Sequence, residues 1–309
     1  MYDTVRMEIL QKDVSFPLVK TIPNYLTNLS EHHWDTEYYY LSGYLGKLQV
    51  NISEDKLKIP KGNLTSYFFD NPFSTLRRGS TEEVIMKLSD ELHLNMQDAR
   101  VSRIDIGDTF KMDFDESIYY KYLGDCTYHN RQEMDNGIYY KGANKTMTLY
   151  GKDKQLKNQR KTIPDQYKGG HYLRYELRLL KKLNSIYHSN NILASDLYDE
   201  EFYMKSIDIW KEHYFKINKY SKPMAQIPVT TSTKELMYSL ANLSLSEHGY
   251  LNCKQTIREW QIKGLINKKQ ASDLRKKIDS ISDYSLKLSP NDLTEELDNK
   301  IIESTKNYR

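Results

Sequence analysis

The sequence predicts an α+β protein in which an antiparallel sheet, with helices on one of its faces, precedes a C-terminal helical domain. Alternation of apolar and polar residues, typical of strands, dominates up to about residue 185. One amphipathic helical segment interrupts these strands near residue 80. After Leu183 the apolar spacing becomes helical, so we expect two domains, at residues 1–187 and 188–309.

The individual elements follow from local patterns. Val84, Ile85, Leu88 and Leu92 form an apolar stripe that predicts a helix, with Ser80 as its cap. Strands are expected at residues 1–10, 101–107 (VSRIDIG), 137–142 (GIYYKG), 144–152 (NKTMTLYGK) and 173–182 (LRYELRLLKK). The later helices are expected at residues 194–217, 233–242, 253–263 and 268–281.

Composition excludes a membrane-spanning protein and indicates a cytoplasmic one. The 309 residues are 39% apolar and 28% charged, which suits a globular chain with a substantial core. No run of roughly 18 apolar residues is present, and the first residues do not resemble a signal peptide. Cys126 and Cys253 form no CxxC pair. We therefore expect the cytoplasm of a bacterium or of a phage's host.

The distribution of charge indicates a nucleic-acid partner. The net charge is only +3, but residues 82–135 hold thirteen acidic and six basic residues. Residues 141–182 hold twelve basic and three acidic residues. Positive charge concentrated in this way can neutralise a phosphate backbone. Solvated surface lysine in a lysine-rich chain is the alternative interpretation.

Polar residues recur with a two-residue period on one side of three predicted strands. If these strands share a sheet, their polar side chains converge on its open face. They are Arg103, Asp105, Tyr150, Lys152, Arg174, Glu176 and Arg178. Two carboxylates beside cations favour a hard divalent ion and a phosphodiester, and a tyrosine there can attack phosphorus.

Ordinary structural roles would also explain these residues. The chain has 26 tyrosines, most of which must be core or surface aromatics. Asp105 can be a salt-bridge partner of Arg103, and Glu176 can pair with neighbouring arginines. His171 has the apolar parity of its strand and is interpreted as a structural histidine.

Three blocks in order, VSRIDIGDTF, MTLYGKDKQLK and YLRYELRLLKK, resemble those of the rolling-circle replication initiators of filamentous phages, the gene II/X family. They are also similar to blocks of the staphylococcal-type plasmid initiators. The resemblance covers roughly residues 1–190. It implies that residues 1–187 nick DNA.

The resemblance assigns roles residue by residue. It makes Tyr150 the nucleophile with Lys152 beside it, and Asp105 and Glu176 the ligands of Mg²⁺ or Mn²⁺. We expect cations in and next to these blocks to bind DNA: Arg103, Arg174, Arg178, Lys141, Lys145 and Lys154. Relatives often carry a glutamate shortly after the lysine, and this chain departs from them with Lys154, Gln155 and Leu156, so that acid has no counterpart at these positions.

The resemblance implies origin-specific nicking that leaves a 5′-phosphotyrosine and a free 3′-OH primer. Two alternatives stay open: a relaxase of a mobilisable element, and a non-catalytic DNA-binding regulator. No GxxxxGK[ST] motif is present, so a host helicase is an expected partner of the origin DNA complex. The basic helices at 253–263 and 268–281 are expected to form a hairpin in which they pack against each other. The alternative is that their basic edge recognises the origin or mediates a homodimer.

Overall fold

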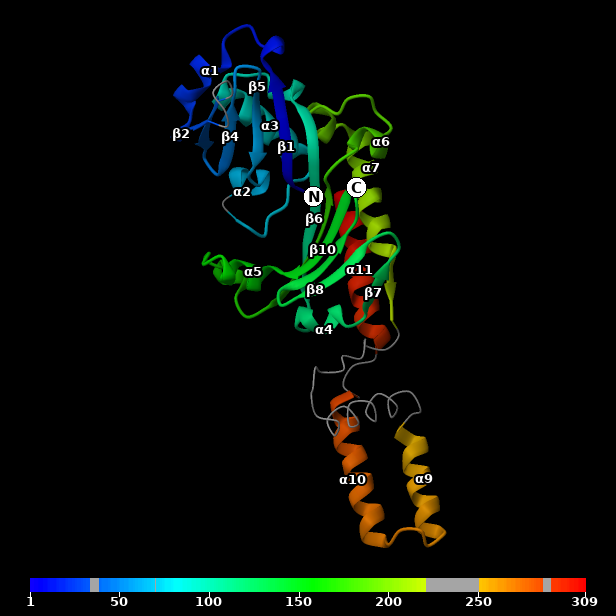
Figure 1. Cartoon of the computed structure of the whole chain (residues 1–309). Helices are drawn as coiled ribbons and strands as arrows, with labels where there is room; N and C mark the ends of the chain where they lie inside the picture. The colour runs from blue at the N-terminus through cyan, green and yellow to red at the C-terminus, as the bar shows by residue number, and fades with distance from the viewer. Residues whose placement is uncertain (34–38, 70, 221–249, 286–289) are drawn as a thin grey trace. The chain divides into compact units, whose positions relative to one another are not determined.

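The computed structural model describes residues 1–33, 39–69, 71–220, 250–285 and 290–309. The chain forms two compact units (Figure 1). Unit 1 comprises residues 1–218 and 297–309, and unit 2 comprises residues 219–296. The domain boundary expected after residue 187 therefore falls inside unit 1.

Ten strands of the described chain form one sheet in unit 1, and all neighbouring pairs are antiparallel, as predicted. In spatial order they are β2 (Thr27–His33), β3 (Tyr39–Leu45), β4 (Leu48–Ile52), β5 (Lys56–Lys61), β1 (Tyr2–Leu10), β6 (Arg100–Met112), β11 (His171–Leu179), β10 (Lys145–Gly151), β9 (Gly137–Lys141) and β8 (Asn130–Met134). A second, two-stranded sheet pairs β7 (Leu123–Cys126) with β12 (Ile217–Lys219).

Helices pack against the sheet of unit 1 or connect its strands. They are α1 (Leu18–Thr21), α2 (Leu64–Phe68), α3 (Arg78–Leu92), α4 (Glu116–Tyr120), α5 (Lys152–Asn158), α6 (Leu183–Tyr187), α7 (Glu200–Phe215) and α11 (Pro290–Tyr308). Short 3-10 helices are η1 (Gln11–Asp13), η2 (Ile22–Tyr25), η3 (Met96–Asp98), η4 (Asp165–Tyr167) and η5 (Ser195–Tyr198).

The predicted helix near residue 80 is α3, and its apolar stripe is fully buried. Its start differs from the prediction. Arg77 is the capping residue, and Ser80 lies in the first turn, where its hydroxyl accepts a hydrogen bond from the Arg77 backbone.

Helices α7 and α11 cover the apolar face of the central strands (Figure 1). On that face the Tyr175 ring of β11 packs against Trp210 and Tyr214 of α7, with ring centroids 5.1 and 5.5 Å apart. Ser304 of α11 donates a hydrogen bond to Asp108 of β6 at 2.6 Å. The opposite face of the same strands carries the predicted polar residues, so the sheet has one side packed and one side available for chemistry.

Unit 2 contains α9 (Tyr250–Ile262) and α10 (Lys268–Ser285), close to the helices predicted at 253–263 and 268–281. The two helices contact each other, and Ile257 and Ala271 are buried between them, as the hairpin prediction expects. The helix predicted at 233–242 lies outside the described residues. None of the helices described here is long and apolar enough to cross a membrane.

Candidate active site on the polar face of the sheet

Three of the predicted site residues lie on one face of three adjacent strands. Residues directly opposite each other in an antiparallel pair of strands lie on the same face of the sheet. Asp105 of β6 is opposite Arg178 of β11, and Glu176 of β11 is opposite Thr148 of β10. Tyr150 is opposite Arg174, two residues further along β11. Asp105, Glu176 and Tyr150 thus follow a diagonal across the sheet, at the roughly 7–8 Å residue spacing that is usual for diagonal neighbours. Their catalytic and metal-binding roles remain predictions.

Asp3 joins this face, and the sequence patterns gave no indication of it. In the pairing of β1 with β6, Tyr2 faces Ile106 and Val5 faces Ile104. Two residues of β1, Asp3 and Thr4, therefore lie opposite Asp105, which makes a β-bulge. The bulge directs the Asp3 carboxylate toward the polar face. A bulge depends on how two distant strands pair, so no local alternation could have revealed it.

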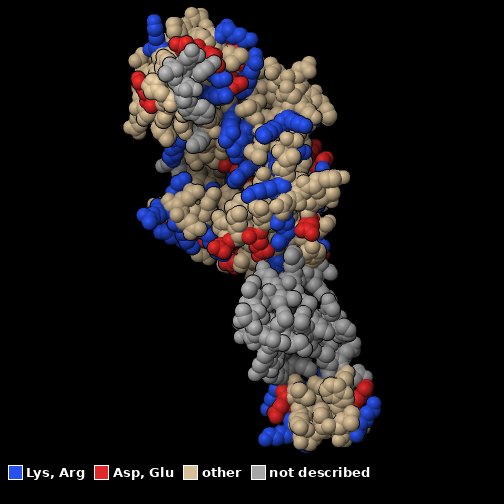
Figure 2. All heavy atoms as spheres, viewed as in Figure 1, with Lys and Arg blue, Asp and Glu red and all other residues tan. Residues whose placement is uncertain are grey.

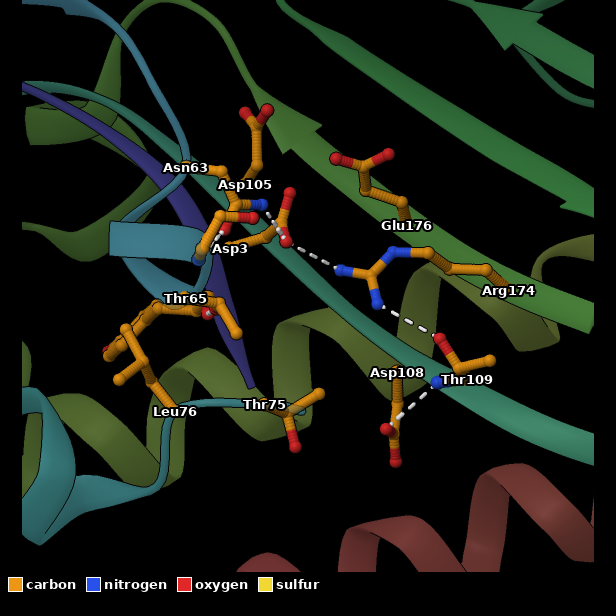
Figure 3. A network of polar contacts seen from close by, with 12 residues as sticks. Asp3, Asn63, Thr65, Thr75, Leu76, Asp105, Asp108, Thr109, Arg174 and Glu176 are labelled. Atoms are coloured by element: carbon orange, nitrogen blue, oxygen red, sulfur yellow. Dashed lines mark hydrogen bonds and ion pairs between the residues drawn. The ribbon is translucent and has the colours of Figure 1, made fainter. Parts of the chain in front are cut away.

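Arg174 links these groups and is only 1% exposed. Figure 3 shows its guanidinium between Asp3 and Thr109. Nη2 donates to Asp3 Oδ1 at 2.9 Å, and Nη1 donates to Thr109 Oγ1 at 3.0 Å. Gly107 leaves room for this reach, because a Cβ at that position would lie 3.3 Å from Arg174 Nη2 and 3.0 Å from a backbone oxygen. Arg174, which the sequence predicts to bind DNA, is therefore also a buried structural residue that contacts Asp3 and Thr109.

The two predicted metal ligands are buried and paired with arginines. Asp105 is 2% exposed and accepts two hydrogen bonds from Arg103, at 2.7 and 2.6 Å, while Glu176 is 3% exposed and accepts one from Arg178 at 3.0 Å. Burial is the main reason why the pKa of Asp105 rises to about 6. The Arg103 hydrogen bonds oppose that rise, and the charge of Glu176 adds to it. The arginines thus do not fully compensate the buried negative charge.

Tyr150 and Lys152 share the same charged neighbours. Burial, and then the charge of Glu176, raises the pKa of the Tyr150 phenol well above its ordinary range, while Arg174 opposes this. The spacing of Lys152 predicted that it continues the strand of Tyr150. It is instead the first residue of α5. Burial, followed by repulsion from Arg174, lowers the pKa of Lys152 to about 8. The lysine is therefore partly neutral close to physiological pH.

The remaining predicted DNA-binding lysines lie in different places. Lys141 is exposed and is opposite Thr146, on the face of Tyr150. Lys145 belongs to the other face, where its ammonium lies 3.0 Å from His213 Nε2 of α7. Lys154 forms ion pairs with Asp115, the cap of α4, and with Glu116 of α4. Of these three lysines, Lys141 is the one with an exposed side chain on the strand face that carries Tyr150.

Basic side chains nevertheless gather near the site. The segment that starts with α5 carries Lys152, Lys154, Lys157, Arg160 and Lys161. Figure 2 shows Lys and Arg side chains gathered around α5 and along the middle of unit 1. This distribution agrees with the basic segment noted in the sequence and suits a polyanionic partner.

The chain belongs to the phage family described as the N-terminal part of the gene II replication-associated protein, whose model matches residues 1–197. The match spans the central strands of the sheet and all residues of the candidate site. It confirms the resemblance to phage replication initiators that the three sequence blocks carry. The chain is therefore a replication-associated protein. No curated protein matches it.

Proposed function

We propose that this protein starts rolling-circle replication by nicking one strand of origin DNA, with Tyr150 as the nucleophile. The observation that carries the proposal is the diagonal of Asp105, Glu176 and Tyr150 on one face of the sheet, within the family match. A non-catalytic DNA-binding protein would need the basic surface but not a tyrosine placed beside two buried carboxylates.

The carboxylates fit a divalent ion. Asp105 and Glu176 present oxygen donors on the same face, and Asp3 adds a third carboxylate nearby. Burial, with the charge of Glu176 added to it, raises the pKa of Asp105, and a bound divalent ion would offset that cost. Asp105 and Glu176 would hold Mg²⁺ or Mn²⁺, with Asp3 as an additional ligand. A bound ion would supply positive charge for the phosphate oxygens as the phosphorus centre is attacked.

The reaction is a transfer of the DNA phosphate to the protein. The Tyr150 oxygen forms a bond to phosphorus, and the bond between phosphorus and the 3′ oxygen breaks. The phenol loses its proton, and the departing 3′ oxygen takes one up, which leaves a free 3′-OH and a 5′-phosphotyrosine. One phosphodiester replaces another, so the energy of the broken bond is retained for rejoining. Since Tyr150 is only 6% exposed, side chains that cover its ring must move when DNA binds.

Three cations have distinct parts in this reaction. Lys152, with a pKa near 8, can accept the phenolic proton in its neutral form or stabilise the phenolate in its charged form. Arg178 is partly exposed and can form hydrogen bonds to the non-bridging oxygens of the phosphate. Arg174 is buried, so it positions Asp3 and counteracts the rise in the Tyr150 pKa.

The direct test is a denaturing gel. The full-length protein is mixed with supercoiled DNA of its own replicon and with Mg²⁺ or Mn²⁺, and the DNA is then separated under denaturing conditions. The proposal expects a nicked strand whose 5′ end carries the protein and whose 3′ end a polymerase can extend. Specific binding to the origin without any covalent product would instead indicate a DNA-binding regulator.

A further inference from the structure

A second cluster of potential ligands lies at the end of β10, outside the diagonal of Asp105, Glu176 and Tyr150. One ligand atom from each of Asp115, Glu116 and His171 lies within 4.8 Å of the other two. Asp115 and Glu116 come from the start of α4, and His171 is the first residue of β11. The β6–β11 pairing brings together residues that are more than fifty positions apart in the sequence.

Glu116 is the least ordinary member of this cluster. Its side chain is 1% exposed, and its Oε2 receives no hydrogen bond from the described residues. A buried carboxylate without full hydrogen bonding costs free energy unless a positive charge compensates it. Gly151 makes room for it, because a Cβ there would overlap Glu116 Oε1 at 1.9 Å. The backbone next to Tyr150 is therefore shaped around this carboxylate.

The compensating charge within the described chain is the ammonium of Lys154. Lys154 Nζ lies 2.9 Å from both oxygens of Asp115 and 2.9 Å from Glu116 Oε1. It thus sits between the two carboxylates, as a bound cation would. Lys154 comes from α5, its side chain is 38% exposed, and it can swing into solvent without leaving a cavity in the core.

We infer that Asp115, Glu116 and His171 form a second divalent-cation site, in which the Lys154 ammonium holds the place of the metal ion until one binds. A metal ion about 2.0–2.3 Å from each donor keeps the donors within about 4.5 Å of one another. Donors that already lie within 4.8 Å need only small side-chain movements to reach this geometry.

The donor set selects the kind of ion. An imidazole with two carboxylates suits Mn²⁺, Zn²⁺ or another transition ion better than Mg²⁺, which prefers oxygen ligands alone. Asp105, Glu176 and Asp3 offer oxygen donors only, so nitrogen coordination distinguishes the two sites. Binding at the second site would release Lys154 toward DNA phosphates, a consequence that rests on the proposed function.

The test is pulsed electron paramagnetic resonance of Mn²⁺ bound to the full-length chain, which detects the ¹⁴N of a coordinated imidazole. Asp105→Asn and Glu176→Gln are introduced together so that the oxygen-only site cannot bind. The inference expects nitrogen modulation in this background and its loss in His171→Gln. The exposed His33 provides the control, and His33→Gln should keep the signal.

Lys154→Met gives a second, independent measurement. Removing the competing ammonium should raise Mn²⁺ affinity about tenfold, equivalent to about 1.4 kcal/mol. If the double-substituted background does not fold, the His171→Gln and Lys154→Met comparisons are made in the wild-type chain, where nitrogen coordination still reports on this site alone. Nitrogen modulation that persists in His171→Gln, or an affinity unchanged in Lys154→Met, would overturn the inference. Neither readout depends on DNA cleavage, so failure of the proposed nicking reaction would be distinguishable.

Discussion

Arg174 of β11 is joined to Asp3 of β1 across the intervening strand β6 by an ion pair of 2.9 Å. The guanidinium is buried, and its other amino group donates to Thr109 of β6. The pair and this hydrogen bond therefore tie three strands together on the face that carries the candidate active site. An arginine that is buried in this way is costly to leave without its carboxylate.

The first prediction follows from that pair. Asp3→Asn keeps the shape of the side chain but removes the charge that compensates Arg174, so the free energy of unfolding should fall by about 2–4 kcal/mol. Urea denaturation followed by circular dichroism measures this. Glu200→Gln is the control, because Glu200 makes an exposed ion pair with Arg78 and should change stability by no more than about 0.5 kcal/mol. Equal effects of the two substitutions would contradict the structural role of the Arg174–Asp3 pair.

Much of the site could be predicted from the sequence, because a two-residue period is a local property. The alternation in LRYELRLLKK and VSRIDIG is sufficient to place Glu176 and Asp105 on the polar face, and the turn after Lys141 predicts the β9–β10 hairpin. These features depend on neighbours in the chain, and they are the ones the structure reproduces.

The features that the sequence missed depend on distant pairing. Asp3 reaches the site through a bulge between β1 and β6. His171, interpreted as a structural histidine, lies beside Asp115 and Glu116 only because β11 pairs with the end of β6. Helix α11 packs on the apolar face of the sheet, although unit 2 separates it in the sequence from the rest of unit 1. No local pattern could therefore place it there.

The second prediction concerns the two buried acids. Asp105→Asn and Glu176→Gln should each abolish cleavage while origin binding, measured by electrophoretic mobility shift, falls less than about threefold, because affinity for DNA comes mainly from Lys and Arg contacts. Asp108→Asn is the matched control. It lies on the same strand as Asp105 but on the opposite face, bonded to Ser304, and should retain cleavage. Parallel loss of binding and cleavage would mean that Asp105 and Glu176 maintain the fold instead.

The third prediction is a pH dependence that originates on the opposite face of the sheet from the candidate site. His213 Nδ1 lies 2.7 Å from the Ile209 carbonyl, and Nε2 lies 3.0 Å from the Lys145 ammonium. The neutral ring therefore donates through Nδ1 and accepts through Nε2. Burial is the main cause that lowers the pKa of His213 from 6.5 to about 4, and Lys145 lowers it further. Between these two pKa values the unfolded chain binds a proton that the folded chain does not, so stability falls as pH falls.

His213→Gln should remove that contribution. On going from pH 7.5 to pH 5, the pH passes through about 1.5 units of the interval between the unfolded and folded pKa values of His213. The wild-type protein should therefore lose about 2 kcal/mol more stability than the variant. Urea denaturation at both pH values measures the difference. His33→Gln serves as the comparison, because His33 is exposed and the variant should follow the wild-type protein. The same pH dependence in His213→Gln and in the wild-type protein would show that His213 is protonated at pH 5 in the folded chain as it is in the unfolded chain.

The last prediction concerns Tyr150. Tyr150→Phe removes one oxygen and keeps the ring, so folding and origin binding should survive while the covalent DNA adduct disappears completely. A tyrosine that only positioned the substrate would cost about one hydrogen bond, on the order of 1–2 kcal/mol, and leave one-tenth to one-thirtieth of the rate. The two cases are separated by quantifying the adduct on a denaturing gel over a long time course. Tyr139→Phe is the matched control, because Tyr139 is opposite Thr148 and shares the sheet face of Tyr150. If Tyr150→Phe still became attached to DNA and Tyr139→Phe did not, the nucleophile would be Tyr139, one strand further from the carboxylates.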